Sequence, residues 1–406
     1  MGTLFAKIRR MNAVMFLSMM ALVVVGTMAI YSAGSARSIA AMHHAYAAHL
    51  KIALFSLVLY FAFALTDYRR MLDIFAVPAY VLSTLLLVVV LLVGSEIYGG
   101  RRWLWFFQPS EVAKLALILL FAAVYGLHGR LDGHFGMRTE TPSGWKGLSM
   151  GLALIGIPAA LVFAEPDLGT TLVIVPTGIA MLFAARVCWK GLVAIIAVVA
   201  VASAFVLGSV SAASRAKDAE TRDRILARTH LKAHQIKRLQ VFLNPDSDIH
   251  GAGYTLRQSR ISVGSGGLYG RGWMKGEQYR LGYLPPSISM NDFIFAVLAE
   301  EAGFAGSALV LVLYAGILFS GLWVGLKCRD DSGRILAVGV TTLLFCHVYV
   351  NVAMNIGLVP ITGLPLPFIS SGRTFMVVLV SALGVLQSVS VHGNADEADY
   401  RKETVQ

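Results

Sequence analysis

Charged residues are scarce in this 406-residue chain: Asp, Glu, Lys and Arg together make up 14% of it, and 57% of residues are hydrophobic. Soluble domains carry roughly 25% charged residues, so this composition excludes an ordinary soluble protein. The mean hydropathy of +0.69 points the same way. We therefore predict an all-α, polytopic membrane protein.

Three further absences narrow the function. Cysteine occurs only at Cys188, Cys328 and Cys346, a spacing that fits no metal site, so we expect reduced, structural thiols. A GK[ST] sequence is missing, which excludes a P-loop and gives no sign of an ATP-driven pump. The first apolar run is too long for a cleavable signal peptide and lacks a small-residue cleavage site, so we expect it to remain as a span.

Long hydrophobic runs dominate what is present. A membrane-crossing helix needs about 20 apolar residues, and on this measure the runs predict about ten transmembrane helices. The runs lie near residues 12–33, 50–66, 72–94, 110–126, 147–164, 168–185, 189–210, 296–326, 334–354 and 374–391. We expect one ten-span membrane domain covering 1–406, with residues 211–290 as a large extracytoplasmic loop between spans seven and eight.

The distribution of Lys and Arg predicts the orientation. Short loops on one side of the predicted membrane hold fifteen of these residues and those on the other side hold five. Because cytoplasmic loops are enriched in Lys and Arg, both termini are predicted to be cytoplasmic. Long loops are exempt from this rule, so the loop 211–290, with thirteen Lys or Arg against six Asp or Glu, can lie outside. There it would attract anionic lipid headgroups or a pyrophosphate, and not nucleic acid.

Two patterns stand out within this basic loop. Residues 214–243 predict one amphipathic basic helix, which either caps the bundle or lies on the membrane surface. The sequence GSGGLYGRG (264–272) lacks the strand and helix that a nucleotide-binding glycine motif requires. We expect its glycines to let the backbone approach a ligand or a membrane surface closely.

Ionisable groups at the membrane edge are the candidates for chemistry. Asp292 lies at the start of the apolar segment NDFIFAVLAEEAGFAG (291–306). A charged group in this position is costly unless it is paired or functional, so it marks a functional site by default. Glu111 and Lys114 are three residues apart on one helix face and are expected to pair. The pair is either a structural salt bridge or part of a polar cavity near Arg102.

Other polar residues have structural interpretations. Asp167, in the turn AEPDLGT (164–170), is predicted to cap a helix. His347, Asn351 and Asn355 recur every four residues and predict interhelical hydrogen bonds.

A proline-rich segment, NIGLVPITGLPLPFISSGR (355–373), then breaks the ninth span. Irregular backbone at this depth is tolerated only where it lines protein or a watery cavity. Glu111, Lys114, Asp292 and this break are therefore predicted to surround a polar pocket that opens to the outer side.

Several motifs in this chain resemble, in order, those of one family. The motifs are RRW…FQPSEVAKLALI, EPDLGTTLVI, RLQVFLNPDSD…GAGY…QSRISVGSGGLYGRGWMKGEQ, YLPP…NDFIFAVLAEEAGFAG and NIGLVPITGLPLPFIS. They resemble the SEDS family (shape, elongation, division and sporulation proteins), which are ten-span peptidoglycan polymerases of bacterial inner membranes. The stretch GRGWMKGEQYRLGYLP is more similar to the elongation branch (RodA-like) than to the division branch (FtsW-like).

The resemblance implies that the chain polymerises lipid II into glycan strands at the outer face of the inner membrane during cell elongation, and that undecaprenyl pyrophosphate leaves. Asp292 matches the family's essential aspartate, and Glu111 and Lys114 match its intramembrane carboxylate–lysine pair. The implied partners are lipid II, undecaprenyl-linked glycan, membrane lipid, a class B penicillin-binding protein and other elongation-complex membrane proteins.

The chain also departs from the family pattern. Met290 and Asn291 replace the usual His and Thr of HTDFIF, and Pro286 replaces an acidic residue. Arg373 lies where small residues are usual. These changes bear on how the acceptor is positioned, whereas Asp292 itself is intact.

Glycosyl transfer from a lipid pyrophosphate needs a base for the acceptor hydroxyl and positive charge for the leaving group. Asp292 is the predicted base, and desolvation at the bilayer edge should raise its pKa. Lys114, Arg102, loop arginines or a divalent cation (Mg²⁺ or Mn²⁺) would supply the charge; no tightly bound cofactor and no protein metal site are expected. The other predicted substrate contacts are Gln258, Ser259, Ser265 and Lys275.

Two alternatives remain open. Intramembrane charged pairs and broken helices also suit a transporter, here a lipid II flippase. Two features weigh against it: the charges cluster toward one face, and the outer loop resembles a substrate-handling domain. The second alternative is a non-catalytic scaffold for a penicillin-binding protein, against which an intact Asp292 argues.

Overall fold

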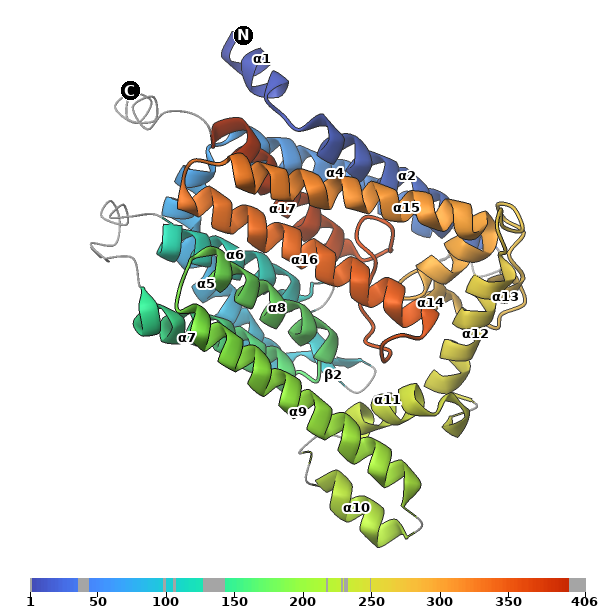
Figure 1. The fold of residues 1–406 in the computed structure, drawn as a ribbon. Helices are drawn as coiled ribbons and strands as arrows, with labels where there is room; N and C mark the ends of the chain where they lie inside the picture. The colour runs from blue at the N-terminus through green and yellow to red at the C-terminus, as the bar shows by residue number, and fades with distance from the viewer. Residues whose placement is uncertain are drawn as a thin grey trace.

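Ten apolar helices form the bundle in the computed structural model, which describes residues 2–35, 44–97, 100–104, 107–126, 143–216, 218–227, 229, 233–248 and 250–393 (Figure 1). They are α2 (Ala13–Ser35), α4 (Ala45–Leu65), α5 (Tyr68–Val93), α6 (Pro109–Gly126), α7 (Gly144–Ala164), α8 (Leu168–Ala184), α9 (Trp189–Arg215), α15 (Ile294–Lys327), α16 (Asp331–Ile356) and α17 (Arg373–His392). In this part of the chain, nine helices have 18 residues or more and α8 has 17. Each coincides with one predicted span, so the all-α polytopic fold is confirmed.

The remaining elements lie at the two ends of the bundle. They are α1 (Gly2–Arg9), the antiparallel strands β1 (Ser95–Ile97) and β2 (Gly100–Trp103), α10 (Ala219–Ala227), α11 (Ala233–Leu243), the 3₁₀ helix η1 (Pro245–Ser247), α12 (Ala252–Ser265), α13 (Glu277–Arg280) and α14 (Pro286–Ser289). Figure 1 shows α1 at one end, and β2 and α11 to α14 at the other. The end of α17 lies with α1, since Ser390 Oγ donates to the carbonyl oxygen of Arg10 at 3.3 Å.

The amphipathic segment 214–243 differs from the prediction of one continuous helix. The end of α9 extends to Arg215, and Ala216 then adopts an extended backbone (φ −67°, ψ 130°). Two shorter helices, α10 and α11, follow in place of a single one. A helical hydrophobic period does not reveal such breaks, because the period can resume in register after a turn.

The most central helices are α6, α16 and α17. In the most apolar 18 residues of each helix, the buried share is 72% for α6, 72% for α16 and 83% for α17. In α9 the buried share is only 6%. Local signals fix the ends of α16: the Asp330 side chain accepts from Gly333 N at 3.4 Å, and Gly357 closes the helix in the left-handed region (φ 79°). Its His347, Asn351 and Asn355 are therefore held at the centre of the bundle, where each is fully buried.

The glycine-rich loop, residues 266–272, packs into a break in α15. Gly303 has φ 67° and ψ −164°, which interrupts the helix and leaves backbone groups that need partners. Phe304 N and Ala305 N donate to the carbonyl oxygens of Gly267 and Leu268, both at 2.9 Å. A Cβ on Gly270 would lie 2.0 Å from the Glu301 carbonyl oxygen. The predicted close backbone approach is thus made to α15, and an approach to a ligand or a membrane surface stays a prediction.

Candidate functional site

Asp292 lies two residues before α15 and is fixed through its main chain. Its carbonyl oxygen accepts from Asn351 Nδ2 at 2.9 Å and from Asn355 Nδ2 at 3.0 Å. Its partly exposed side chain lies against the proline-rich segment, because a Cβ on Gly363 would be 3.4 Å from Asp292 Oδ2. Gly363 has φ 79°, a conformation that favours glycine. Asn351 and Asn355 of α16 therefore hold the main chain of Asp292 in place, and the predicted hydrogen bonds from this helix to its neighbours are confirmed.

Two carboxylates and two arginines are gathered around this point, and we call Asp167, Asp292, Arg102 and Arg238 the charged quartet. Arg102 Nη1 lies 3.9 Å from Asp167 Oδ1, and Arg238 Nη1 donates to the Thr362 carbonyl oxygen at 3.1 Å. Arg238 interacts electrostatically with the other three members. When both carboxylates are ionised, the quartet is neutral overall.

Backbone and cap interactions hold Arg102 and Asp167. Arg102 Nε donates to the Glu165 carbonyl oxygen at 3.4 Å, and its Nη2 donates to that of Pro166. Asp167 Oδ1 accepts from Thr170 N at 3.0 Å, so the predicted cap is confirmed. Its other oxygen, Oδ2, accepts from Gln108 Nε2 at 3.4 Å. The cap residue is therefore also a member of the site.

The pKa of Asp292 is raised to about 6: burial raises it most, Arg238 opposes this, and the smaller effects of Asp167 and Arg102 raise and lower it respectively. The predicted upward shift is confirmed. A carboxyl group with this pKa is mostly ionised at neutral pH and is a stronger base than an ordinary aspartate. Together, the two arginines favour the ionised form of Asp292.

A second carboxyl group adjoins the quartet. Glu165 is fully buried, and burial followed by the charge of Asp167 raises its pKa to about 8, against an opposing effect of Arg102. At neutral pH it therefore carries a proton, so it adds no negative charge beside Asp167.

Glu111 and Lys114 form the predicted ion pair within α6. Lys114 Nζ lies 2.9 Å from Glu111 Oε1 and 2.8 Å from His347 Nε2. An ammonium group can only donate, so His347 Nε2 accepts here. Lys114 Nζ also lies 5.7 Å from the ring centroid of Phe375. The ammonium group is therefore surrounded by partners.

The pair is sealed inside the bundle, with 3% of Glu111 and 2% of Lys114 exposed. It connects to Asp292 through α16, where Asn351 lies one turn after His347 and bonds the Asp292 carbonyl oxygen. Asn351 also donates to Leu364 O in the proline-rich segment at 2.7 Å. The two predicted groups therefore contact the same helix one turn apart, and the prediction that Glu111 and Lys114 line an open pocket is wrong. The core helices α16 and α17 cover them.

The other predicted contacts are dispersed. Ser259 is buried and donates to the Asn355 carbonyl oxygen at 2.9 Å, which fastens α12 to α16. Ser265 Oγ donates to Ser262 O at 3.0 Å within its own helix. Gln258 is partly buried and Lys275 is exposed. Among the predicted substrate contacts, only Arg102 is brought into the quartet.

Sequence reasoning missed two buried acidic residues, Glu300 and Glu301, in α15. Glu300 Oε1 accepts from Glu277 N at 2.7 Å and from Gln278 N at 3.2 Å. Glu301 Oε1 accepts from Met274 N at 3.0 Å. The adjacent acidic pair in the sequence was a signal that went unused. These carboxylates hold the segment that contains Lys275 against the start of α15.

Within the described ranges, no group of three or more His, Cys, Asp or Glu side chains is arranged to hold a metal ion. The expectation that a divalent cation supplies charge at the site stays a prediction.

The fold and the site define a class: a helical, polytopic membrane protein with two carboxyl groups and two arginines gathered at one end of its bundle. Residues 12–395 match the FtsW/RodA/SpoVE family, described as cell cycle proteins, and the chain belongs to this family. This confirms the SEDS resemblance.

Two curated relatives illustrate the family. Peptidoglycan glycosyltransferase MrdB of Escherichia coli (strain K12) is 35% identical over 317 residues, which is 77% of each chain. Peptidoglycan glycosyltransferase RodA of Treponema pallidum (strain Nichols) is 28% identical and covers 93% of this chain and 96% of the relative.

Solved structures share the fold. A chain from a study of the structural coordination of polymerization and crosslinking by a peptidoglycan synthase complex superposes with a TM-score of 0.71, at 26% identity, covering 95% of this chain and 99% of that one. RodA of Thermus thermophilus superposes with a TM-score of 0.62, at 24% identity, covering 95% and 98%.

Proposed function

We propose that this chain is a peptidoglycan glycosyltransferase that polymerises lipid II into glycan strands. The names of its relatives support this activity. The structural observation that carries the proposal is the position of Asp292, a partly exposed carboxylate with a pKa of about 6 beside Arg102 and Arg238. The leaving group of this reaction is a pyrophosphate, for which arginine is a suitable partner.

In the proposed reaction, the Asp292 carboxylate removes the proton from the 4-hydroxyl of the acceptor sugar. The acceptor oxygen then bonds to C1 of the donor sugar as the bond from C1 to the pyrophosphate oxygen breaks. Undecaprenyl pyrophosphate leaves with the bonding electrons, and the arginines of the quartet offset its charge. Asp292 afterwards releases its proton to solvent, which its pKa permits at neutral pH.

We place the quartet on the outer side of a bacterial inner membrane, with the loop 211–290 also outside and both termini in the cytoplasm. This orientation is supported by the excess of Lys and Arg in the short loops at the opposite end. Lipid II headgroups at the outer leaflet would then reach Asp292 from the membrane surface.

The proposed partner is a class B penicillin-binding protein, which would crosslink the strands that this chain polymerises. The similar synthase complex is described as coordinating polymerization with crosslinking, and this supports such a pairing. Other elongation-complex membrane proteins are proposed as further partners.

The flippase alternative is less well supported. A transporter needs polar groups near the bilayer midplane that are open to its two sides in turn. Here Glu111 and Lys114 are sealed by contacts with His347 and Phe375, and the accessible members of the quartet lie at one end of the bundle. A scaffold without chemistry would not need the upward-shifted pKa of Asp292.

The test is a lipid II polymerisation assay in liposomes with a class B partner, comparing the wild type, Asp292→Ala and Asp246→Asn. Asp246 lies in the loop 211–290 and forms an exposed ion pair with Arg257, outside the quartet, so Asp246→Asn is a matched control. We expect glycan ladders from the wild type and Asp246→Asn and none from a folded Asp292→Ala. Equal ladders from all three chains would overturn the proposal.

A further inference from the structure

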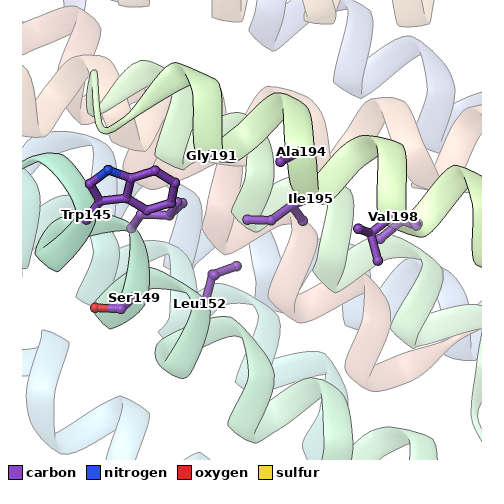
Figure 2. Close-up of a pocket in the computed structure, with 9 residues that line it drawn as sticks. Trp145, Ser149, Leu152, Gly191, Ala194, Ile195 and Val198 are labelled. Atoms are coloured by element: carbon purple, nitrogen blue, oxygen red, sulfur yellow. The ribbon is translucent and has the colours of Figure 1, made fainter.

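An apolar groove lies between α7 and α9, at the end of the bundle where both helices begin. Its volume is about 340 Å³, and it is lined by Leu148 and Leu152 from α7 and by Ile195 and Val198 from α9. Figure 2 shows Leu152 pointing toward Ile195. Trp145 lies at the start of the groove, beside the first turn of α9. The volume lies within the range of ligand sites, about 300–1,000 Å³.

The groove offers no free polar group of note. Its one hydroxyl group, that of Ser149, donates to the Lys146 carbonyl oxygen at 3.0 Å. The helix α9 is also the least buried of the spans, so this surface is open to the membrane. An apolar groove in a bilayer suits a hydrocarbon chain. The chain fills the groove and makes many weak dispersion contacts with the side chains of its walls.

Cations surround the end of the groove. Trp145 and Gly191 are in contact, since a Cβ on Gly191 would lie 3.1 Å from Trp145 Cζ3. Their neighbours in sequence, Lys146 and Lys190, are both exposed, as is Arg186. The stretches 143–151 and 184–195 contain no Asp or Glu. The charge at this rim therefore complements a phosphate group.

Two tryptophans place this rim at the depth of lipid headgroups. Trp145 is 68% exposed and Trp189 is 64% exposed. Exposed tryptophans of membrane proteins concentrate at the membrane–water interface. The lysines beside them thus lie at the height of lipid phosphates, and the apolar walls extend from there into the hydrocarbon region.

We propose that this groove binds an anionic phospholipid of the adjacent leaflet, with one acyl chain between α7 and α9 and the phosphate held by Lys146 and Lys190. The polyprenyl substrate is a poorer fit. From Trp145, α7 runs to Glu165 beside the quartet, a distance of about 30 Å at 1.5 Å per residue. A substrate with its pyrophosphate at the quartet cannot also place it at these lysines.

The test measures binding of dioleoyl phosphatidylglycerol and dioleoyl phosphatidylcholine to the purified full chain in detergent by native mass spectrometry. We expect the wild type to prefer phosphatidylglycerol by about 25-fold, because each of the two lysines near the anionic headgroup contributes about fivefold. The double variant Lys146→Gln/Lys190→Gln should lose this preference. Ala194→Trp, which fills the groove, should bind both lipids weakly. Val198→Trp repeats the groove test if Ala194→Trp has a lowered melting temperature.

Lys327 provides a matched control. It lies 4.6 Å from the ring centroid of Trp323 at the same end of the bundle, a pair that does not line this groove. Lys327→Gln should leave the preference unchanged. An equal loss in Lys327→Gln would mean nonspecific attraction, and unchanged binding in folded groove variants would overturn the site. Displacement of phosphatidylglycerol by equimolar undecaprenyl phosphate would identify the polyprenyl chain as the occupant and overturn the proposal as well.

Discussion

Arg238 donates from Nη1 to the carbonyl oxygen of Thr362 at 3.1 Å. This hydrogen bond joins an arginine of α11 to the proline-rich segment, which packs against Asp292 at Gly363. The two residues are 124 positions apart in the sequence. The contact joins α11, outside the bundle, to the segment that follows α16. A single hydrogen bond thus places positive charge beside the proposed base.

Replacing Arg238 should change the pH dependence of polymerisation. Arg238 lowers the pKa of Asp292, so Arg238→Gln should raise that pKa above about 6 and move the acidic limb of the rate profile to higher pH. The expected displacement is roughly one unit, the low end for loss of a nearby opposite charge. The measurement is the initial polymerisation rate between pH 5 and 8, with Lys237→Gln as control. Lys237 is exposed and pairs with Asp248, so its loss should leave the profile in place. Coincident profiles for wild type and Arg238→Gln would contradict this role.

Asn351→Ala should lower the polymerisation rate without changing the side chain of Asp292. The variant removes hydrogen bonds to the carbonyl oxygens of Asp292 and Leu364, both of which position the site. A buried carbonyl left unpaired costs about 1–3 kcal/mol, so the melting temperature should also fall. Rates and melting temperatures are compared with those of Asn244→Ala, whose exposed side chain accepts from Asp246 N in the 3₁₀ helix η1. Wild-type rates in Asn351→Ala would show that α16 does not position Asp292.

Lys114→Met should destabilise the protein strongly, because it leaves the Glu111 carboxylate buried without its cation. Breaking a buried pair from one side typically costs about 3–5 kcal/mol. The double variant Glu111→Gln/Lys114→Met removes both charges and should recover part of the lost melting temperature. Thermal unfolding in detergent measures both. A double variant less stable than the single one would contradict the description of the pair as a sealed, mutually compensating unit.

Gly270→Ala should disorder the glycine-rich loop. Gly270 has φ 79°, and an added Cβ would lie 2.0 Å from the Glu301 carbonyl oxygen. We expect a lower melting temperature and faster proteolysis of the loop. Gly264→Ala is the matched control, because a Cβ there meets nothing within 4 Å and alanine favours the helix α12 by about 0.5–1 kcal/mol. Equal stability of the two variants would refute the proposed packing against α15.

The parts of the fold that follow from local chemistry could be predicted from the sequence. A helix that crosses a bilayer needs a long apolar run, so the ten spans could be predicted from the sequence. The three-residue spacing of Glu111 and Lys114 predicted their ion pair. The quartet could not be read in this way, because Arg238 reaches Thr362 through tertiary structure and resembles the other loop arginines in sequence. Asp167 was predicted only as a cap, since sequence gives no sign that it also faces Arg102. The sealing of Glu111 likewise depends on how α16 and α17 pack.

The most direct test of the account is the pH profile of lipid II polymerisation by the wild type and Asp292→Asn, each with a class B partner. Asparagine keeps the shape of the side chain but cannot act as the base. We predict that the wild-type rate falls by half near pH 6, the pKa of Asp292, and that folded Asp292→Asn forms no strands at any pH. Polymerisation by Asp292→Asn at the wild-type rate would contradict the central claim that Asp292 is the catalytic base.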